Sequence, residues 1–180
     1  MTSSLWYQEK AVFAAAIEDV YAALFAQSRA QPGGDPLLLD VRDVSGTPGT
    51  AGFVQQARVN DGALDLILLE TIIAIEPPRH LQVRQLPDAL VRHDPGERDA
   101  PFLGTLVDDL DVEFTRKFGD PPAHTDLIYD LATVDSGTEV TITIDVPGVA
   151  KAGWLQRRFW RKAIRKEVAR IKARITQAVA

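Results

Sequence analysis

The chain contains no cysteine, which excludes disulfide bonds, thiolate zinc sites and a cysteine nucleophile. Its three histidines (His80, His93 and His124) lie far apart, and no His-x-x-x-His or Glu-x-x-His pair is present. We therefore predict no metal site. A Gly-x-Ser-x-Gly elbow, a phosphate-binding glycine loop and a dinucleotide fingerprint are also lacking, so we predict no cofactor. No motif by itself identifies a reaction.

Long hydrophobic runs are also lacking. An uninterrupted apolar stretch such as Ala11–Ile17 is far shorter than the roughly 20 residues of a membrane-spanning helix. The acidic residues Glu9, Glu18 and Asp19 flank it, whereas a signal peptide has a basic leader. We expect a cytoplasmic protein.

The composition is that of an ordinary globular protein, with 46% hydrophobic and 25% charged residues among 180. We expect residues 1–180 to form a single domain. The net charge of −5 is divided unevenly: residues 151–180 carry +9, and the first 150 residues carry −14. Such a division indicates either an anionic partner or a basic helix lying on an acidic body, and the second explanation requires no partner.

The pattern of apolar residues predicts strands at both ends of a long β region. A first strand is expected over Leu5–Phe13, and helical spacing begins immediately after it, over Ile17–Phe25. In the last strand, apolar and polar residues alternate, which indicates one buried and one solvated face. The six strands predicted after the helix are Leu37–Val44, Gly52–Val59, Leu64–Ile75, Arg79–Leu86, Asp126–Val134 and Thr138–Val146.

Two further segments complete the predicted chain. Residues 87–125 form an insertion between the last-but-two and last-but-one strands, and its spacing favours a helix over a strand. The insertion is either a lid or a surface elaboration. The C-terminal segment Ala152–Val179 predicts a helix about 42 Å long, with one apolar stripe that must pack on the sheet. The stripe consists of Trp160, Ile164, Val168, Ile171, Ile175 and Val179.

Four short motifs lie at the junctions of these elements: Asp19-Val20-Tyr21, Gly52, Glu76-Pro77-Pro78-Arg79-His80-Leu81 and Gly137-Thr138-Glu139-Val140. Together with the element order, they resemble the helix-grip fold of the START-related lipid-transfer superfamily (SRPBCC). That superfamily includes the polyketide cyclase/dehydrase and birch-pollen-allergen branches. The resemblance implies an α+β fold in which a curved, antiparallel, seven-stranded sheet surrounds the long C-terminal helix, with an apolar cavity between them. The insertion at 87–125, and the lack of a tryptophan-containing stretch after the first helix, depart from the family pattern.

The resemblance places the ligand between the sheet and the last helix. The alternation in the last strand indicates that Val140, Ile142 and Ile144 face inward, and the same parity places Leu127 inward, but the strand Leu64–Ile75 is apolar on both faces. Its inward set is either Leu69, Thr71 and Ile73 or Leu68, Glu70 and Ile72, and its second face indicates a homodimer contact or a contact with the insertion. The predicted ligand-binding residues are Leu69, Thr71, Ile73, Leu81, Val83, Tyr129, Leu131, Ile142, Trp160, Ile164 and Val168.

Two polar residues are candidates for catalysis. Tyr129 either points its hydroxyl at a ligand or bonds to the backbone, as core tyrosines commonly do. Glu70, if it faces inward, is a carboxylate with a raised pKa and a candidate general acid or base. The usual exposure of glutamate favours the outward position instead.

Three functions follow as hypotheses. The leading one is binding or carriage of a small hydrophobic, lipid-like or polyketide-like molecule. The second is a polyketide cyclase/dehydratase-type enzyme using Glu70 and Tyr129. The third is an interaction protein that binds RNA or an anionic membrane through the basic C-terminal helix, although those bases can equally serve to solubilise the helix.

Overall fold

The computed structural model describes residues 4–28, 38–60, 64–92, 124–147 and 154–180. Its described strands form one antiparallel sheet in the order β1-β7-β6-β5-β4-β3-β2, accompanied by two described helices. The predicted α+β architecture is confirmed. The elements are β1 (Ser4–Phe13), α1 (Ile17–Ser28), β2 (Leu38–Ser45), β3 (Val54–Asn60), β4 (Leu64–Glu76), β5 (His80–Arg92), β6 (Thr125–Val134), β7 (Gly137–Pro147) and α3 (Trp154–Val179).

One boundary differs clearly from the prediction. β5 continues to Arg92 rather than ending at Leu86, so the insertion follows Arg92 and does not begin at Pro87. Proline cannot donate a ladder hydrogen bond, and the strand accommodates it beside an irregularity, where Leu68 pairs with Pro87 and Ile67 pairs with Ala89. The helix and the lid predicted for the insertion lie in residues 93–123, outside the described part.

The turn between β6 and β7 is joined tightly to the β1–α1 connection. Gly137 has φ +129°, and a Cβ atom at this position would overlap the carbonyl oxygen of Phe13. The next residue, Thr138, is fully buried and donates its hydroxyl to the carbonyl oxygen of Ala15 at 2.8 Å. The Gly-Thr motif therefore allows two chain segments far apart in sequence to approach closely.

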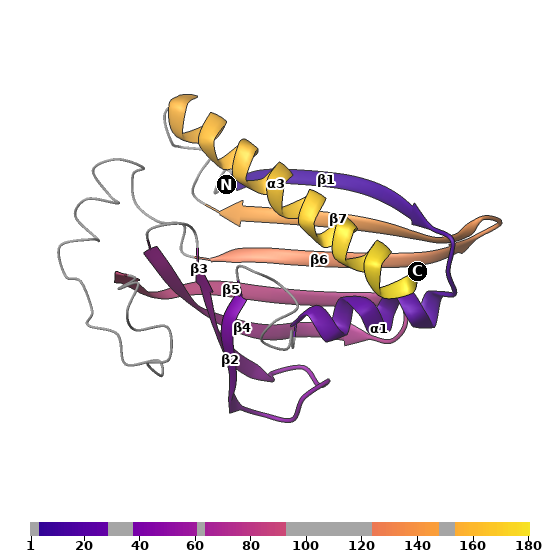
Figure 1. The fold of residues 1–180 in the computed structure, drawn as a ribbon, viewed down its shortest axis with the longest axis horizontal. Coiled ribbons are helices and arrows are strands. Elements are labelled where there is room, and N and C mark those ends of the chain that lie inside the picture. The colour runs from indigo at the N-terminus through magenta and orange to yellow at the C-terminus, as the bar shows by residue number, and fades with distance from the viewer. Residues whose placement is uncertain (1–3, 29–37, 61–63, 93–123, 148–153) are drawn as a thin grey trace.

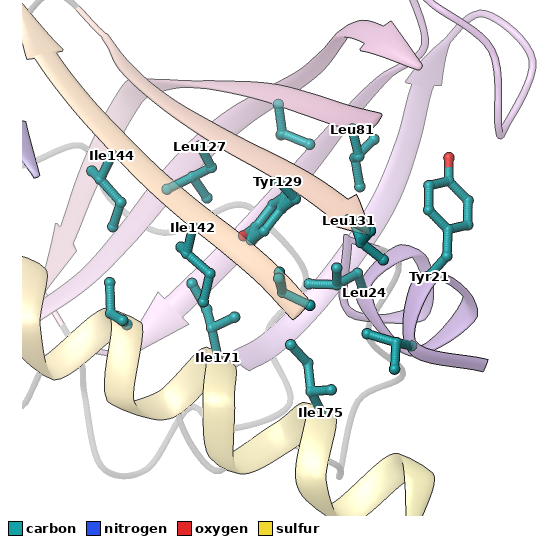
Figure 2. Close-up of a cluster of buried hydrophobic side chains, with 14 of the residues drawn as sticks. Tyr21, Leu24, Leu81, Leu127, Tyr129, Leu131, Ile142, Ile144, Ile171 and Ile175 are labelled. Carbon is teal, nitrogen blue, oxygen red and sulfur yellow. The ribbon is translucent and has the colours of Figure 1, made fainter. Parts of the chain in front are cut away.

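Helix α3 crosses one face of the sheet diagonally, and its C-terminal end lies beside α1 (Figure 1). Ile171 and Ile175 project from α3 toward the sheet, and Ile142 of β7 points toward Ile171 (Figure 2). Val168 of α3 is buried in the same core. The apolar stripe predicted from the sequence is thus the buried side of the helix. No helix in the described ranges is both long enough and apolar enough to cross a membrane.

Candidate ligand-binding site

Most residues predicted to face the interior do so. In the sheet, the buried members are Leu81, Val83, Leu127, Tyr129, Leu131, Val140, Ile142 and Ile144. In α3, Ile164, Val168 and Ile171 are buried, and Trp160 is partly buried against the same core. These placements are confirmed as positions in the core, and contact with a ligand stays a prediction.

Strand β4 requires a correction. The pairs Glu76–His80 and Ile75–Leu81 run regularly from the turn, but Val83 then pairs with Ile72, which leaves Ile73 as an extra residue in a bulge. Since neighbouring residues of a strand alternate between faces, the bulge exchanges the inward and outward sets. The inward residues are therefore Leu68, Glu70 and Ile72. The choice of Leu69, Thr71 and Ile73 was wrong, because they lie on the outer face.

The outer face of β4 is buried in part within the single chain. Ile67 is only 5% exposed within the single chain, and its cross-strand neighbour Arg58 is 9% exposed. Nearby on the same face, Gln56 donates to Asp88 of β5 at 2.6 Å. Burial within one molecule thus accounts for Ile67, whereas Ile73 on the same face is 38% exposed.

Glu70 faces inward, contrary to what the usual exposure of glutamate favours. It is the direct partner of Gln55 on β3 and of Gln85 on β5. Each glutamine donates its amide N–H to a different carboxylate oxygen of Glu70, at 2.6 Å in both cases. Directly paired residues project from the same face of a sheet, so the three side chains form a polar row, Gln55–Glu70–Gln85, on a largely apolar surface.

The surroundings of Glu70 favour its neutral form. Desolvation is the main cause that raises the pKa of the Glu70 carboxyl above its ordinary value, and the negative charge of Glu167 acts in the same direction. The two glutamine hydrogen bonds and the charge of Arg174 oppose the rise without cancelling it. This carboxyl therefore binds a proton more readily than an exposed glutamate does.

The polar row borders a narrow cleft. Phe53, Gln55, Glu70, Ile72 and Val83 line a space too narrow to hold a water molecule. The carbonyl oxygen Oε1 of the Gln55 side chain is buried and has no hydrogen-bond partner in the described part of the chain. An amide oxygen left unpaired in this way is an unused acceptor beside the carboxylate.

Tyr129 also belongs to this interior. It is 6% exposed, and its ring lies between Leu127 and Leu131 on the inner face of β6 (Figure 2). Burial raises the pKa of its hydroxyl, helped by the negative charges of Glu167 and Glu70. Within the described residues this hydroxyl makes no hydrogen bond, so the backbone bond considered for it is not found there.

Charged residues of α3 lie on the side of the helix that influences Glu70 and Tyr129. Glu167 accepts a hydrogen bond from Arg170 at 2.8 Å and one from Arg174 at 3.5 Å. Sequence reasoning missed these residues and both glutamines. Only the pairing of the strands could have revealed the glutamines, since nothing in their local sequence distinguishes them.

The remaining basic residues of α3 are mostly on its surface. Lys172 pairs with Glu9 of β1 at 2.7 Å, as expected for a basic helix on an acidic body. Trp154, at the start of the helix, is 69% exposed. The exposed bases that follow it are Arg157, Arg158, Arg161, Lys162, Arg165 and Lys166.

Other polar side chains of the sheet lie away from the polar row. Arg84 points outward and binds Asp126 through two hydrogen bonds of 2.7 and 2.8 Å. His80 contacts the exposed Asp130 at 2.7 Å. Within the described ranges, no three His, Cys, Asp or Glu side chains gather in a way that could hold a metal ion.

Comparison with known proteins supports the fold. No protein-family model and no curated protein sequence matches the chain. Among solved structures, Ara h 8.0201 is 12% identical, with a TM-score of 0.68 and 98% of each chain covered. The di-domain ARO/CYC StfQ from the steffimycin biosynthetic pathway is 10% identical, with a TM-score of 0.66, and the match covers 98% of this chain and 51% of StfQ.

A third solved structure, ginseng major latex-like protein 151 from Panax ginseng, is 14% identical, with a TM-score of 0.57 and coverage of 98% and 95%. Such low identities establish architecture and not activity. The chain has the helix-grip fold that its motifs predicted.

Proposed function

We propose that this protein binds or carries a small, largely apolar molecule between the sheet and α3, with residues 1–180 acting as one ligand-binding domain. The observation that carries the proposal is the Gln55–Glu70–Gln85 row on an otherwise apolar inner face. A buried acceptor without a partner costs about 1–3 kcal/mol, and Gln55 Oε1 is such an acceptor. A ligand with an apolar body and one polar group could pack its body against the apolar surface and donate a hydrogen bond to Gln55 Oε1.

Binding requires the interior to widen. The cleft beside Glu70 does not admit a water molecule, so a ligand must displace side chains of the cleft or move α3 away from the sheet. Widening on ligand binding is compatible with a helix that contacts the sheet through one stripe of side chains.

Native mass spectrometry tests the proposal directly. Protein purified from its own host is measured intact, then denatured and extracted. We expect a reproducible additional mass that disappears on denaturation and is recovered as a small molecule. Absence of such a mass, together with failure of the protein to bind an apolar fluorescent dye, would contradict the proposal.

A second function is favoured by the titration behaviour of the interior. Glu70 and Tyr129 both face inward and both have raised pKa values, which suits Glu70 to donate or accept a proton at a higher pH than an exposed glutamate does. We propose a polyketide cyclase/dehydratase-type reaction as this alternative. Glu70→Gln should then abolish turnover of the recovered molecule without loss of binding, and equal activity in the variant would refute it.

A third proposal concerns the exposed bases at the start of α3, a segment without any acidic residue from 154 to 166. Exposed Trp154 lies beside them, and tryptophan with clustered bases is typical of contact with an anionic membrane surface. We expect binding to phosphatidylserine-containing vesicles that weakens as salt rises from about 50 to about 200 mM. Equal binding to neutral vesicles, or binding to RNA alone, would contradict it.

A further inference from the structure

The polar row offers a ligand unused acceptors. One N–H of each glutamine amide is already used in a bond to an oxygen of Glu70. An ionised carboxylate has about four acceptor positions, so Glu70 keeps positions that these two bonds leave unfilled. Gln55 Oε1, which is buried in the same cleft and lacks a partner among the described residues, adds another acceptor.

Among the described residues, no cation is bonded directly to the row. Both hydrogen bonds that the Glu70 oxygens accept come from neutral amides, and Arg174 acts on Glu70 only as a nearby charge. The carboxyl of Glu167 makes the local charge more negative. A carboxylate from a ligand would therefore meet repulsion from the Glu70 carboxylate and the cost of desolvation, without a cation bonded directly to the row.

Resting on the proposed function, we propose that the cleft selects an apolar molecule whose polar end is an uncharged hydrogen-bond donor, a hydroxyl group, and rejects the same molecule ending in a carboxylate. The hydroxyl would donate to Glu70 or to Gln55 Oε1, while the apolar body lies along Phe53, Ile72 and Val83. The selectivity thus comes from the unfilled acceptor positions of Glu70 and from the unpaired Gln55 Oε1, rather than from the shape of the apolar wall.

The test uses three compounds with one tail: 1-decanol, its methyl ether and decanoate. Each displaces the neutral dye N-phenyl-1-naphthylamine from the full-length protein at neutral pH. The alcohol can donate, the ether can only accept, and the carboxylate accepts and carries charge. Hydrogen bonds to charged groups are among the stronger ones. We therefore expect 1-decanol to displace half of the dye at a concentration on the order of tenfold to a hundredfold lower than the ether or decanoate requires.

Two matched variants locate the selectivity. Glu70→Gln replaces the carboxylate by an amide that can also donate, so the discrimination against decanoate should largely disappear. Glu139→Gln makes the same substitution on the outer face, where Glu139 pairs with Lys10 at 2.7 Å, and should leave the discrimination unchanged. Thermal unfolding of each variant verifies that it is folded.

The outcomes separate the inference from the proposed function. Displacement by all three compounds at similar concentrations in the unmodified protein would overturn the selectivity while leaving apolar ligand binding intact. Failure of the dye and of all three compounds to bind would overturn both. Unchanged discrimination in Glu70→Gln would show that another group selects the ligand, and would also overturn the inference.

Discussion

Ile142→Ala measures how tightly the space between the sheet and α3 is filled. Ile142 is fully buried on β7, and Figure 2 shows it directed toward Ile171 of α3. The substitution removes three carbon atoms, worth about 0.8 kcal/mol each, and the cavity left behind adds about 24 cal/mol per Å³ of unfilled volume. We expect the free energy of unfolding to fall by about 3–4 kcal/mol.

Urea unfolding at neutral pH provides the measurement, and two further variants serve as controls. Ile142→Val removes one carbon and should cost about 1 kcal/mol. Ile73→Ala, at a position 38% exposed on the outer face, should cost less than Ile142→Ala because part of its surface already contacts water. A loss for Ile142→Ala no larger than that for Ile73→Ala would refute close packing at this point, and would indicate an interior that is already open.

Three further predictions concern stability. Glu70→Gln should remove a pH dependence from the free energy of unfolding. A carboxyl whose folded-state pKa is raised above its unfolded value stabilises the folded protein at low pH, and this stabilisation is lost as the pH rises through the folded pKa. Urea unfolding from about pH 5 to about pH 8 should therefore show the native protein weakening relative to the variant, and parallel curves would contradict this. Gly137→Ala should cost about 2 kcal/mol or more, whereas Gly52→Ala, with positive φ but open space around its Cβ position, should cost about 1 kcal/mol; equal losses would argue against the overlap. Asp126→Asn should be destabilising at neutral pH because Arg84 lowers the pKa of Asp126, and the difference should shrink as the pH falls from about 4, the ordinary pKa of aspartate, through the lower folded-state pKa. A difference that stays constant as the pH falls below about 4 would contradict this.

The sequence was informative wherever one periodicity held over a whole element. The alternation of β7 identified Val140, Ile142 and Ile144 as inward, and all three are buried. The stripe of α3 was equally clear, because its polar residues occupy the rest of the helix. In both cases one face contacts the core and the other contacts water, so the apolar and polar residue types predict which side chains are buried.

Strand β4 shows why the candidate site could not be predicted as reliably. Counting regularly from the Glu76–His80 pair places Ile73 opposite Val83, and this reproduces the wrong inward set. The bulge at Ile73 shifts the pairing by one residue. The sequence of β4 contains no turn residue or glycine that would predict the bulge. A shift of one residue exchanges every side chain between the two faces. Without knowledge of the bulge, the usual exposure of glutamate is the main guide to the face on which Glu70 lies, and it favours the outer one.

The charged residues of α3 also connect the width of the cleft to the proton on Glu70. Glu167 and Arg174 belong to one continuous helix, so they move together whenever α3 separates from the sheet. Separation admits water and reduces the desolvation that chiefly raises the pKa of Glu70, and closure restores it. Closure without a ligand therefore favours the protonated form of Glu70, whereas a hydroxyl group that donates to the ionised carboxylate opposes protonation. The affinity for such an alcohol should then increase as the pH rises through the folded-state pKa of Glu70.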